Sequence, residues 1–235
     1  MMITQCLITG ASQGIGRATA IALSKTNLYD RLLLVARSSE GLDKTMQLCD
    51  EKTQTVPLAF DLSKLDEIDA FAEAIYNEYG EMDALLNIAG YADPKPLIDT
   101  TAELLKATFT INVYSLVLLT REVAKHMRKK RSGKILNVAS TAGSGARPGW
   151  LAYASSKAAV ISISETLSSE LSEYGIQVYC ISPGRCATEL RAKLAPMEDA
   201  STIMQPEAVA NAIVSVLHDD GLIDGQNIVV RQQVK

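Results

Sequence analysis

Short apolar runs alternate with longer segments of helical periodicity along the whole chain. The first run, residues 6–9, stops at Gly10, and residues 14–25 follow with apolar side chains on one helical face. The next run, residues 32–36, is apolar throughout, which is typical of a strand buried on both faces of a parallel sheet. The repeated pattern predicts strands at residues 6–9, 32–36, 55–60, 84–88, 134–139, 176–182 and 227–231. It predicts helices at residues 14–25, 39–51, 64–79, 102–129, 151–174 and 207–218, the third of them capped by Ser63.

This alternation of strand and helix indicates an α/β fold, a single Rossmann-type domain over residues 1–235. Strands joined by helices pair in parallel through right-handed crossovers, so the seven predicted strands form a doubly wound sheet with helices on both faces, in three layers. No linker or low-complexity stretch interrupts the pattern. Ligands of such sheets bind beyond the carboxyl ends of the strands, so the residues that follow each strand are the candidates for function.

Charge and hydropathy exclude several classes of function. The chain has a formal net charge of -4, and binding a nucleic-acid backbone needs a basic face, so we expect no nucleic-acid partner. The one basic cluster, residues 128–131, ends a predicted helix, where cations are stabilised; a solvated helix end or a contact with a polyanion accounts for it. No apolar run approaches the ~18 residues of a membrane span, so we expect no membrane segment.

Cysteines and histidines point to a reduced protein without a metal site. Cys6 and Cys180 lie in predicted strands and are expected to be buried as small hydrophobic residues. No signal peptide is visible, so we expect free thiols and a cytoplasmic location. The only histidines, His126 and His218, lie in separate predicted helices, so we expect neither a metal site nor a histidine-based catalytic triad.

A glycine-rich turn follows the first predicted strand and opens the first helix. Gly10, Gly14 and Gly16 have the spacing G-x-x-x-G-x-G. Glycines let a backbone approach a pyrophosphate, and a helix N-terminus attracts anions. The turn therefore indicates a nucleotide site, with a tight structural turn as the alternative.

The end of the second strand indicates which nucleotide is bound. Ala36 and Arg37 stand about 20 residues beyond the glycine turn, where the adenine ribose of a dinucleotide is recognised. An acidic residue there would bond the 2′-hydroxyl of NAD, whereas an arginine suits the 2′-phosphate of NADP. Arg37 therefore favours NADP(H) over NAD(H), unless it is a solvated loop residue.

Tyr153 and Lys157 are four residues apart in a predicted helix, so their side chains lie on one face. A free phenol has a pKa of ~10, and a nearby positive charge lowers it. The pair could then exchange a proton with a substrate oxygen. Taken alone, the spacing is more often that of an ordinary surface pair.

Further motifs follow the other strands in a fixed order. Asp61-Leu62 follows the third strand, Asn87-Ile88-Ala89-Gly90 ends the fourth, Ser140 follows the fifth and Pro183-Gly184 follows the sixth. With the turn at residues 9–16, Asn112 and the Tyr153/Lys157 pair, the chain resembles the short-chain dehydrogenases/reductases of the compact, single-domain type over nearly its whole length. Ile88 stands where that family's motif has a second asparagine.

The resemblance implies hydride transfer between a nicotinamide and a carbonyl carbon, and a reversible reduction to an alcohol. It implies that Tyr153 donates the proton, that Lys157 lowers the pKa of Tyr153 and bonds the nicotinamide ribose, and that Ser140 stabilises the substrate oxygen. Asn112 would hold a water beside Lys157; ordinary backbone bonding is the alternative for Ser140 and Asn112. The expected cofactor-binding residues are Gly10, Ser12, Gln13, Gly14, Ile15, Gly16, Arg37, Asp61, Leu62, Asn87, Ala89, Gly90, Tyr153, Lys157, Pro183, Gly184 and Thr188.

The substrate pocket is expected between residues 91–96, 142–150 and 185–205. Trp150 would give it an apolar wall, or simply pack the start of its helix. Arg147 and Arg185 lie near the predicted mouth and could hold a substrate carboxylate or phosphate; solvated arginines are the alternative. The polar loop at residues 188–205 is expected to act as a lid.

The substrate itself and the assembly are less defined. The chain lacks the V-D-G-G ending of many 3-oxoacyl-carrier-protein reductases, and residues 183–191 with the ending after Gly225 are loosely similar to reductases of sugars or polyol phosphates. We therefore expect a general NADPH-dependent carbonyl reductase acting on a small carbonyl or alcohol, with both narrower substrates as alternatives. A non-catalytic NADP-binding regulatory module is the alternative of another class. Residues 102–129 and 151–174 are apolar widely around their circumference, and relatives pair these helices between subunits, so we expect a homodimer or homotetramer.

Overall fold

Seven parallel strands form the centre of the computed structural model, which describes residues 3–219 and 226–232. The strands are β1 (Gln5–Thr9), β2 (Arg31–Ala36), β3 (Gln54–Ala59), β4 (Ala84–Asn87), β5 (Gly133–Val138), β6 (Ile176–Pro183) and β7 (Asn227–Val230). Their order in the sheet is β3-β2-β1-β4-β5-β6-β7, and every neighbouring pair is parallel. The expected doubly wound sheet is confirmed, and each strand end lies within one residue of the predicted one.

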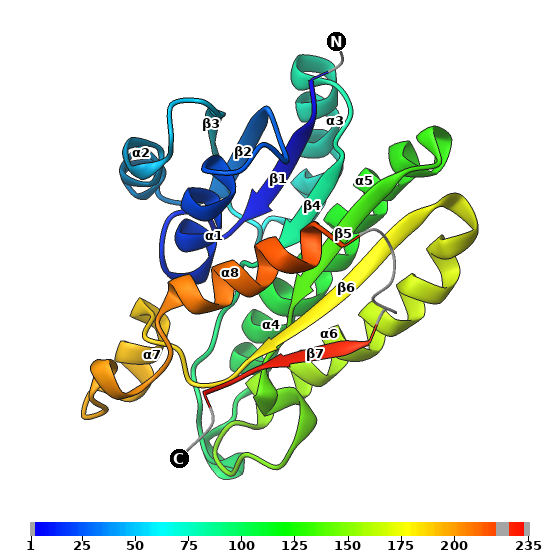
Figure 1. Cartoon of the computed structure of the whole chain (residues 1–235). Coiled ribbons are helices and arrows are strands. Elements are labelled where there is room, and N and C mark those ends of the chain that lie inside the picture. The colour runs from blue at the N-terminus through cyan, green and yellow to red at the C-terminus, as the bar shows by residue number, and fades with distance from the viewer. Residues whose placement is uncertain (1–2, 220–225, 233–235) are drawn as a thin grey trace.

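Helices cover both faces of this sheet (Figure 1). They are α1 (Gly14–Ser24), α2 (Ser39–Leu48), α3 (Ile68–Tyr79), α4 (Ala102–Phe109), α5 (Ser115–Lys130), α6 (Leu151–Leu171), α7 (Glu189–Leu194) and α8 (Pro206–Leu217). Successive strand residues point to opposite faces. Ile8 and Leu34 pack against α1, α2 and α8, whereas Leu7 and Leu33 pack against α3, α5 and α6. All four are fully buried or nearly so, which explains why the strands are apolar without alternation.

The order of the strands reverses between β1 and β4. The chain runs from β1 outward to β2 and β3, then returns to place β4 on the other side of β1. Helices on the two sides leave a crevice at the carboxyl ends of these two strands. The Thr9 hydroxyl joins the strand ends, because it donates to the Leu86 carbonyl at 3.3 Å and accepts from the backbone N–H groups of Ile88 and Ala89 at 3.0 and 3.2 Å.

The predicted helix at residues 102–129 is interrupted. A π-helical turn, Thr110–Tyr114, separates α4 from α5. The Asn112 amide in this turn reaches out of the helix to Tyr91 and Ser156. A π-turn inserts an extra residue into the helix and often marks a functional site. Helical periodicity alone does not reveal this contact, so the interruption was absent from the prediction.

Two local predictions were wrong. Ser63 does not cap a helix: its N–H donates to Asp61 Oδ1 at 2.9 Å, and a 3₁₀ turn, Leu65–Glu67, precedes α3. The segment at residues 188–205 is not simply a loop, because it contains α7 and a 3₁₀ turn, Ala200–Thr202. Thr188 caps α7 by accepting the Arg191 N–H at 3.2 Å, which satisfies a free donor of its first turn.

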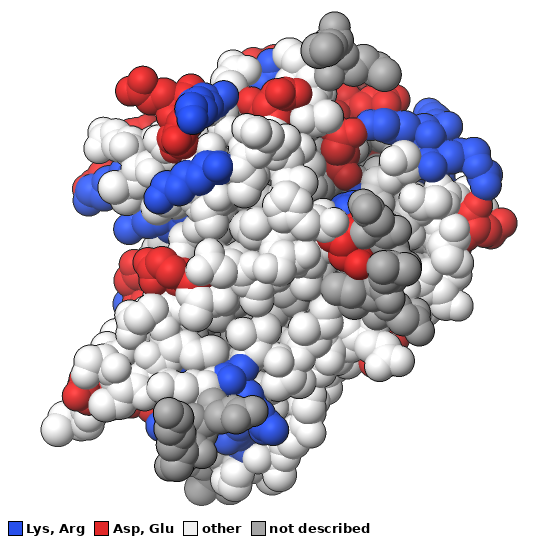
Figure 2. All heavy atoms as spheres, viewed as in Figure 1, with Lys and Arg blue, Asp and Glu red and all other residues white. Residues whose placement is uncertain are grey.

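The basic cluster at residues 128–131 lies at the end of α5, where Figure 2 shows blue side chains gathered at the upper right. Three of its members bond to the protein. Arg128 donates to the Tyr174 hydroxyl at 2.8 Å, Lys130 bonds Asp83, and Arg131 donates to the Glu173 carbonyl at 2.6 Å. These contacts favour the interpretation of a solvated helix end over that of a polyanion site.

By length and composition alone, the tract Ala102–Lys130 could cross a membrane. Core helices of globular proteins meet the same two criteria, and Leu119, Val123 and Met127 of this tract pack into the core beneath the sheet. Only 39% of its most apolar window is buried, however. An apolar face of this tract is therefore left at the surface.

Candidate active site

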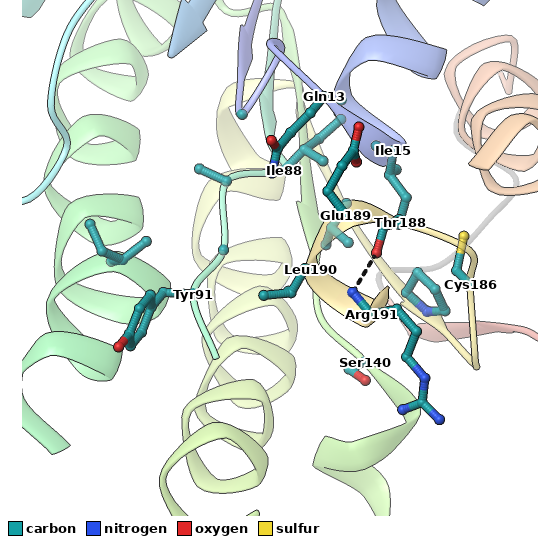
Figure 3. Close-up of a pocket in the computed structure, with 18 of the residues that line it drawn as sticks. Gln13, Ile15, Ile88, Tyr91, Ser140, Cys186, Thr188, Glu189, Leu190 and Arg191 are labelled. Atoms are coloured by element: carbon teal, nitrogen blue, oxygen red, sulfur yellow. Dashed lines mark hydrogen bonds between the residues drawn. The ribbon is translucent and has the colours of Figure 1, made fainter. Parts of the chain in front are cut away.

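A cleft of ≈ 590 Å³ lies at the carboxyl ends of the strands. Segments far apart in the sequence meet around it: in Figure 3, Gln13 and Ile15 come from the start of α1, Ser140 follows β5, and Thr188–Arg191 come from the start of α7. Of the residues predicted to bind cofactor or substrate, nearly all line the cleft. Those that do are Gly10, Ser12, Gln13, Gly14, Ile15, Gly16, Arg37, Asp61, Leu62, Ala89, Gly90, Ser140, Arg147, Trp150, Tyr153, Lys157, Pro183, Gly184, Arg185 and Thr188.

The glycine turn between β1 and α1 is packed too closely for side chains. A Cβ on Gly10 would lie 2.8 Å from the Ala89 Cα, and Gly10 has a φ of +70°. A Cβ on Gly16 would lie 2.1 Å from the Gly10 carbonyl oxygen. The glycines therefore let α1 begin directly against the strand end, with its N-terminus toward the cleft. This cradle is open enough at the backbone to accept a pyrophosphate, so the residues present fit a dinucleotide.

The far end of the cleft is formed by the ends of β2 and β3. Arg37 is exposed there and faces Asp61. The N–H of Ser63 holds the pKa of the Asp61 carboxyl below its usual value, and the Arg37 charge adds to this effect. Ser38 also lines the cleft beside Arg37, and sequence reasoning missed it although it is the next residue.

Tyr153 and Lys157 project from α6 at the centre of the cleft. The Lys157 side chain is buried and donates to the Val138 carbonyl at 2.8 Å. Burial lowers the pKa of Lys157 to about 8. Its Nζ lies 5.9 Å from the centre of the Tyr153 ring. The expected helical pairing on one face is thus present.

The pKa of Tyr153 differs from the expectation. Burial raises the pKa of this phenol, while the Ser140 hydroxyl and the Arg191 charge lower it in part. The expectation considered the lysine charge and omitted the loss of solvation. In this structure the groups that lower the pKa of Tyr153 are Ser140 and Arg191 instead.

Ser140 stands at the end of β5, next to Tyr153. Its Oγ accepts the Ala142 N–H at 3.2 Å, which leaves its proton free to be donated into the cleft. Gly143 allows this turn to pack on α6, because a Cβ there would lie 2.7 Å from the Lys157 carbonyl carbon. Gly143 was not singled out in the sequence, and the signal for it is the glycine three residues after Ser140.

Asn112 does not line the cleft itself, and its side chain is used within the protein. Its Oδ1 accepts the Tyr91 N–H at 2.8 Å, and its Nδ2 donates to the Tyr91 carbonyl and to Ser156 Oγ, both at 2.9 Å. Ser156 in turn donates to the Tyr153 carbonyl at 2.7 Å. Asn112 and Ser156 thus connect the loop after β4 to the helix that carries Tyr153 and Lys157. The water expected beside Asn112 stays a prediction.

Ser156→Ala tests this connection. We expect kcat to fall roughly 10-fold, because the variant loses a hydrogen bond that orients the helix carrying Tyr153 and Lys157. KM for the cofactor should stay nearly unchanged. Ser155→Ala is the matched control, because the Ser155 hydroxyl bonds only to carbonyls of its own helix, at 2.7 and 3.1 Å. Steady-state kinetics of both variants measure the effect. Equal losses in the two serine variants would contradict a positioning role for Ser156.

Asn87 also lies below the cleft rather than in its wall. Its Nδ2 donates to Thr120 Oγ1 and to Asn137 Oδ1, both at 2.9 Å, and Asn137 donates to Ser164 Oγ at 3.0 Å. All four residues are buried. This network ties β4 and β5 to α5 and α6, so it fixes the strand ends that carry Gly90 and Ser140. Direct contact of Asn87 with a cofactor stays a prediction.

The substrate end of the cleft holds all three predicted residues. Trp150 packs edge-on against Tyr153, with ring centres 5.7 Å apart, so it forms part of the wall. Arg147 and Arg185 are exposed at the rim. Leu190, Arg191 and Leu194, which α7 brings into the wall, fall within the predicted segment 185–205, although none of them was singled out in the sequence. The capping signal of Thr188 before Glu189 could have revealed this short helix.

Comparison with known proteins identifies the family of this chain. The family model described as short chain dehydrogenase matches residues 4–199. A 3-oxoacyl-[acyl-carrier-protein] reductase from Thermotoga maritima is 31% identical over 95% of this chain and 94% of that protein. A 2,3-dihydro-2,3-dihydroxybenzoate dehydrogenase from Bacillus subtilis is 35% identical over 78% of this chain and 70% of that protein.

Solved structures show the same fold. A levodione reductase has a TM-score of 0.88 and 25% identity, covering 97% of this chain and 96% of that one. An NAD+-bound xylitol dehydrogenase has a TM-score of 0.85 and 26% identity, covering 97% of each chain. A dinucleotide cleft with a tyrosine and a lysine on one helix defines a nicotinamide-dependent oxidoreductase. The chain belongs to the short-chain dehydrogenase family, whose enzymes act on CH–OH and C=O groups.

Proposed function

We propose that this protein reduces a ketone or aldehyde to an alcohol with NADPH, reversibly. The observation that carries the proposal is the meeting of Ser140, Tyr153 and Lys157 in the cleft that begins at the glycine turn. A non-catalytic NADP-binding module would need the nucleotide half of the cleft alone. Here Ser140, Tyr153 and Lys157 stand in the same cleft as well, which supports an enzyme.

The roles of the residues follow from their positions. A bound nicotinamide supplies or accepts the hydride. Tyr153 gives its phenolic proton to the carbonyl oxygen as negative charge develops there. Ser140 donates a hydrogen bond to the same oxygen, and Lys157, anchored by the Val138 carbonyl, bonds the nicotinamide ribose. Thr188 and the turn of Pro183 and Gly184 lie where the nicotinamide end would rest.

The preference for NADP(H) over NAD(H) rests on Arg37. Its guanidinium stands at the adenine end of the cleft, where a 2′-phosphate would lie. Asp61 follows the neighbouring strand, and the family resemblance implies that it contacts the adenine. The xylitol dehydrogenase structure contains NAD+, so NAD(H) is the alternative cofactor against which NADP(H) is tested.

Arg37→Gln supplies that test. We expect KM for NADPH to rise roughly 10- to 100-fold, because a charge-assisted contact with the phosphate is lost, while KM for NADH changes little. Lys44→Gln on α2 is the matched control, since Lys44 pairs with Glu40 at 2.6 Å and does not line the cleft. Initial rates with both cofactors measure the effect. A parallel rise for NADPH and NADH would show that Arg37 does not read the phosphate.

The proposed substrate is a ketone or aldehyde, with two narrower classes as alternatives. The Thermotoga maritima relative reduces 3-oxoacyl groups on a carrier protein, as its name states, and this supports a 3-oxoacyl substrate as one alternative. The ending of this chain supports a keto-sugar or polyol-phosphate reductase as the other. Turnover with a panel of carbonyls from these classes, with NADPH and with NADH, tests the proposal. Binding of NADPH without turnover of any carbonyl would favour the non-catalytic module.

We also propose that the protein is cytoplasmic and forms a homodimer or homotetramer. Leu105, Tyr114, Val117 and Leu151 expose 36–48% of their surface on α4, the π-turn, α5 and α6. Such residues on neighbouring helices are suited to cover one another in a symmetric pair. The buried thiols of Cys6 and Cys180 agree with a reducing compartment. Light scattering after size-exclusion chromatography measures the assembly.

A further inference from the structure

Three arginines stand around the substrate end of the cleft. Arg147 follows β5, Arg185 follows β6, and Arg191 lies in the middle of α7. The carboxylates that line the cleft are Asp61, at the adenine end, and Glu189, whose Oε2 lies 3.4 Å from a Cβ built on Gly14. The substrate end of the described cleft wall is therefore positively charged, with Lys157 adding a further charge at its centre.

Arg191 is the most enclosed of these arginines, with 25% of its side chain exposed against 61% for Arg185. The Arg191 charge is close enough to Tyr153 to lower the pKa of that phenol. Its backbone is fixed by the bond to the Thr188 hydroxyl, which Figure 3 shows as a dashed line. Because Arg191 and Tyr153 line the same cleft, a substrate whose carbonyl meets Tyr153 would have this arginine in the wall of its pocket.

The Glu198 carboxylate already bonds two of these arginines, Arg191 and Arg185. Arg191 donates Nε to Glu198 Oε2 at 2.6 Å and Nη2 to Glu198 Oε1 at 2.9 Å, and Arg185 donates Nη1 to the same Oε1 at 3.1 Å. Glu198 does not line the cleft but a neighbouring groove on the other side of α7. Arg191 and Arg185 together thus bind a carboxylate through three N–H donors. The single negative charge of Glu198 balances only one of their two positive charges.

We propose that Arg191 and Arg185, with Arg147 across the mouth, form an anion subsite, so that the substrate reduced beside Tyr153 carries a carboxylate or phosphate. The inference rests on the proposed carbonyl reduction and names the substrate class of that site. Arg191 uses Nε and Nη2 for Glu198, and its Nη1 makes no hydrogen bond to the described residues, so this nitrogen is available to an incoming anion. With a neutral substrate, Glu198 would be the one carboxylate paired with these two arginines.

Ligand binding tests the subsite without requiring turnover. Trp150 is the single tryptophan of the chain and lies beside Tyr153, so its fluorescence reports on the pocket. With saturating NADP+, two matched pairs are titrated: acetoacetate against its methyl ester, and dihydroxyacetone phosphate against dihydroxyacetone. We expect the anionic member of at least one pair to bind roughly 10- to 100-fold more tightly. The pair that shows the preference tells carboxylate from phosphate.

Variants assign the preference to the arginines. Arg191→Met is expected to reduce the preference for the anionic ligand to within about threefold. Lys193 is an exposed cation on the same helix, so Lys193→Met should keep the preference. Glu198→Gln removes the internal competitor and is expected to increase the preference severalfold, and it tests the subsite even if Arg191→Met fails to fold. No preference in either pair, or a preference that survives Arg191→Met, overturns the proposal. Anion binding without reduction of any carbonyl would refute the proposed function and leave the subsite standing.

Discussion

Tyr153→Phe is expected to lower NADPH-dependent turnover by about 10³-fold, with NADPH binding nearly unchanged. The phenolic proton is the one that the proposed mechanism transfers, and positioned general acids contribute roughly 10²- to 10⁴-fold. Phenylalanine retains the ring that packs edge-on against Trp150. The variant therefore removes the proton donor and leaves the wall of the cleft in place. Single-turnover rates and a fluorescence titration with NADPH measure the two quantities separately.

Tyr114→Phe is the control for this experiment. Tyr114 is 48% exposed and lies in the π-turn, outside the cleft wall. Removal of its hydroxyl should leave turnover within about twofold, as for most surface substitutions. Activity of Tyr153→Phe equal to that of the Tyr114 control would refute the assignment of Tyr153 as the proton donor. A joint loss of turnover and NADPH binding would instead show that the phenol holds the cofactor.

The sheet was predictable because its signals are local. Residues 32–36 are apolar without interruption, and Gly10, Gly14 and Gly16 mark the turn that must pass close to Ala89. The Tyr153/Lys157 pair follows from helical spacing for the same reason. These features depend on neighbours in the sequence, so they can be read without knowing which segments meet in space.

The parts that could not be predicted depend on contacts between distant segments. The π-turn exists where Asn112 reaches Tyr91 and Ser156, which lie 21 and 44 residues away in the chain. Arg191 gains its place in the cleft only because α7 folds over the ends of the strands. The pKa of Tyr153 rises because of burial, a quantity that the spacing of Tyr153 and Lys157 does not contain.

Burial of Lys157 has a consequence for stability as well as for catalysis. Its pKa falls from 10.5 to about 8, which corresponds to about 3 kcal/mol of unfavourable burial of the ammonium group. The hydrogen bond to the Val138 carbonyl returns about 1 kcal/mol. Burial is thus the larger effect, and the lysine is retained at a net loss of about 2 kcal/mol in folding free energy.

Lys157→Met is therefore expected to raise the unfolding temperature by roughly 4–8 °C at neutral pH while lowering turnover by at least about 10²-fold. The methionine keeps much of the apolar volume and removes the buried charge. Lys52→Met, an exposed lysine in the turn before β3, should change neither quantity. Differential scanning calorimetry and steady-state kinetics provide the two measurements. A variant that melts below the wild type would show that the bond to Val138 outweighs the cost of burial.

The pH dependence separates the charge from the packing of the new side chain. Between about pH 8 and 10.5 the unfolded lysine still binds its proton while the folded one has lost it, so the unfolded state binds more protons and the folded state gains stability as pH rises. Below about pH 8 both states are protonated and the cost is constant. The stability advantage of Lys157→Met should therefore be largest at neutral pH and shrink toward pH 10. The Cys180 thiol is the buried group coupled to the Lys157 charge, but burial raises its pKa to about 11, so it stays protonated below pH 10 in the folded state of both proteins. The difference between the two unfolding curves below pH 10 therefore reports on Lys157. A stability advantage of Lys157→Met that does not depend on pH would come from packing of the methionine. It would show that the Lys157 ammonium group is better solvated than its burial indicates.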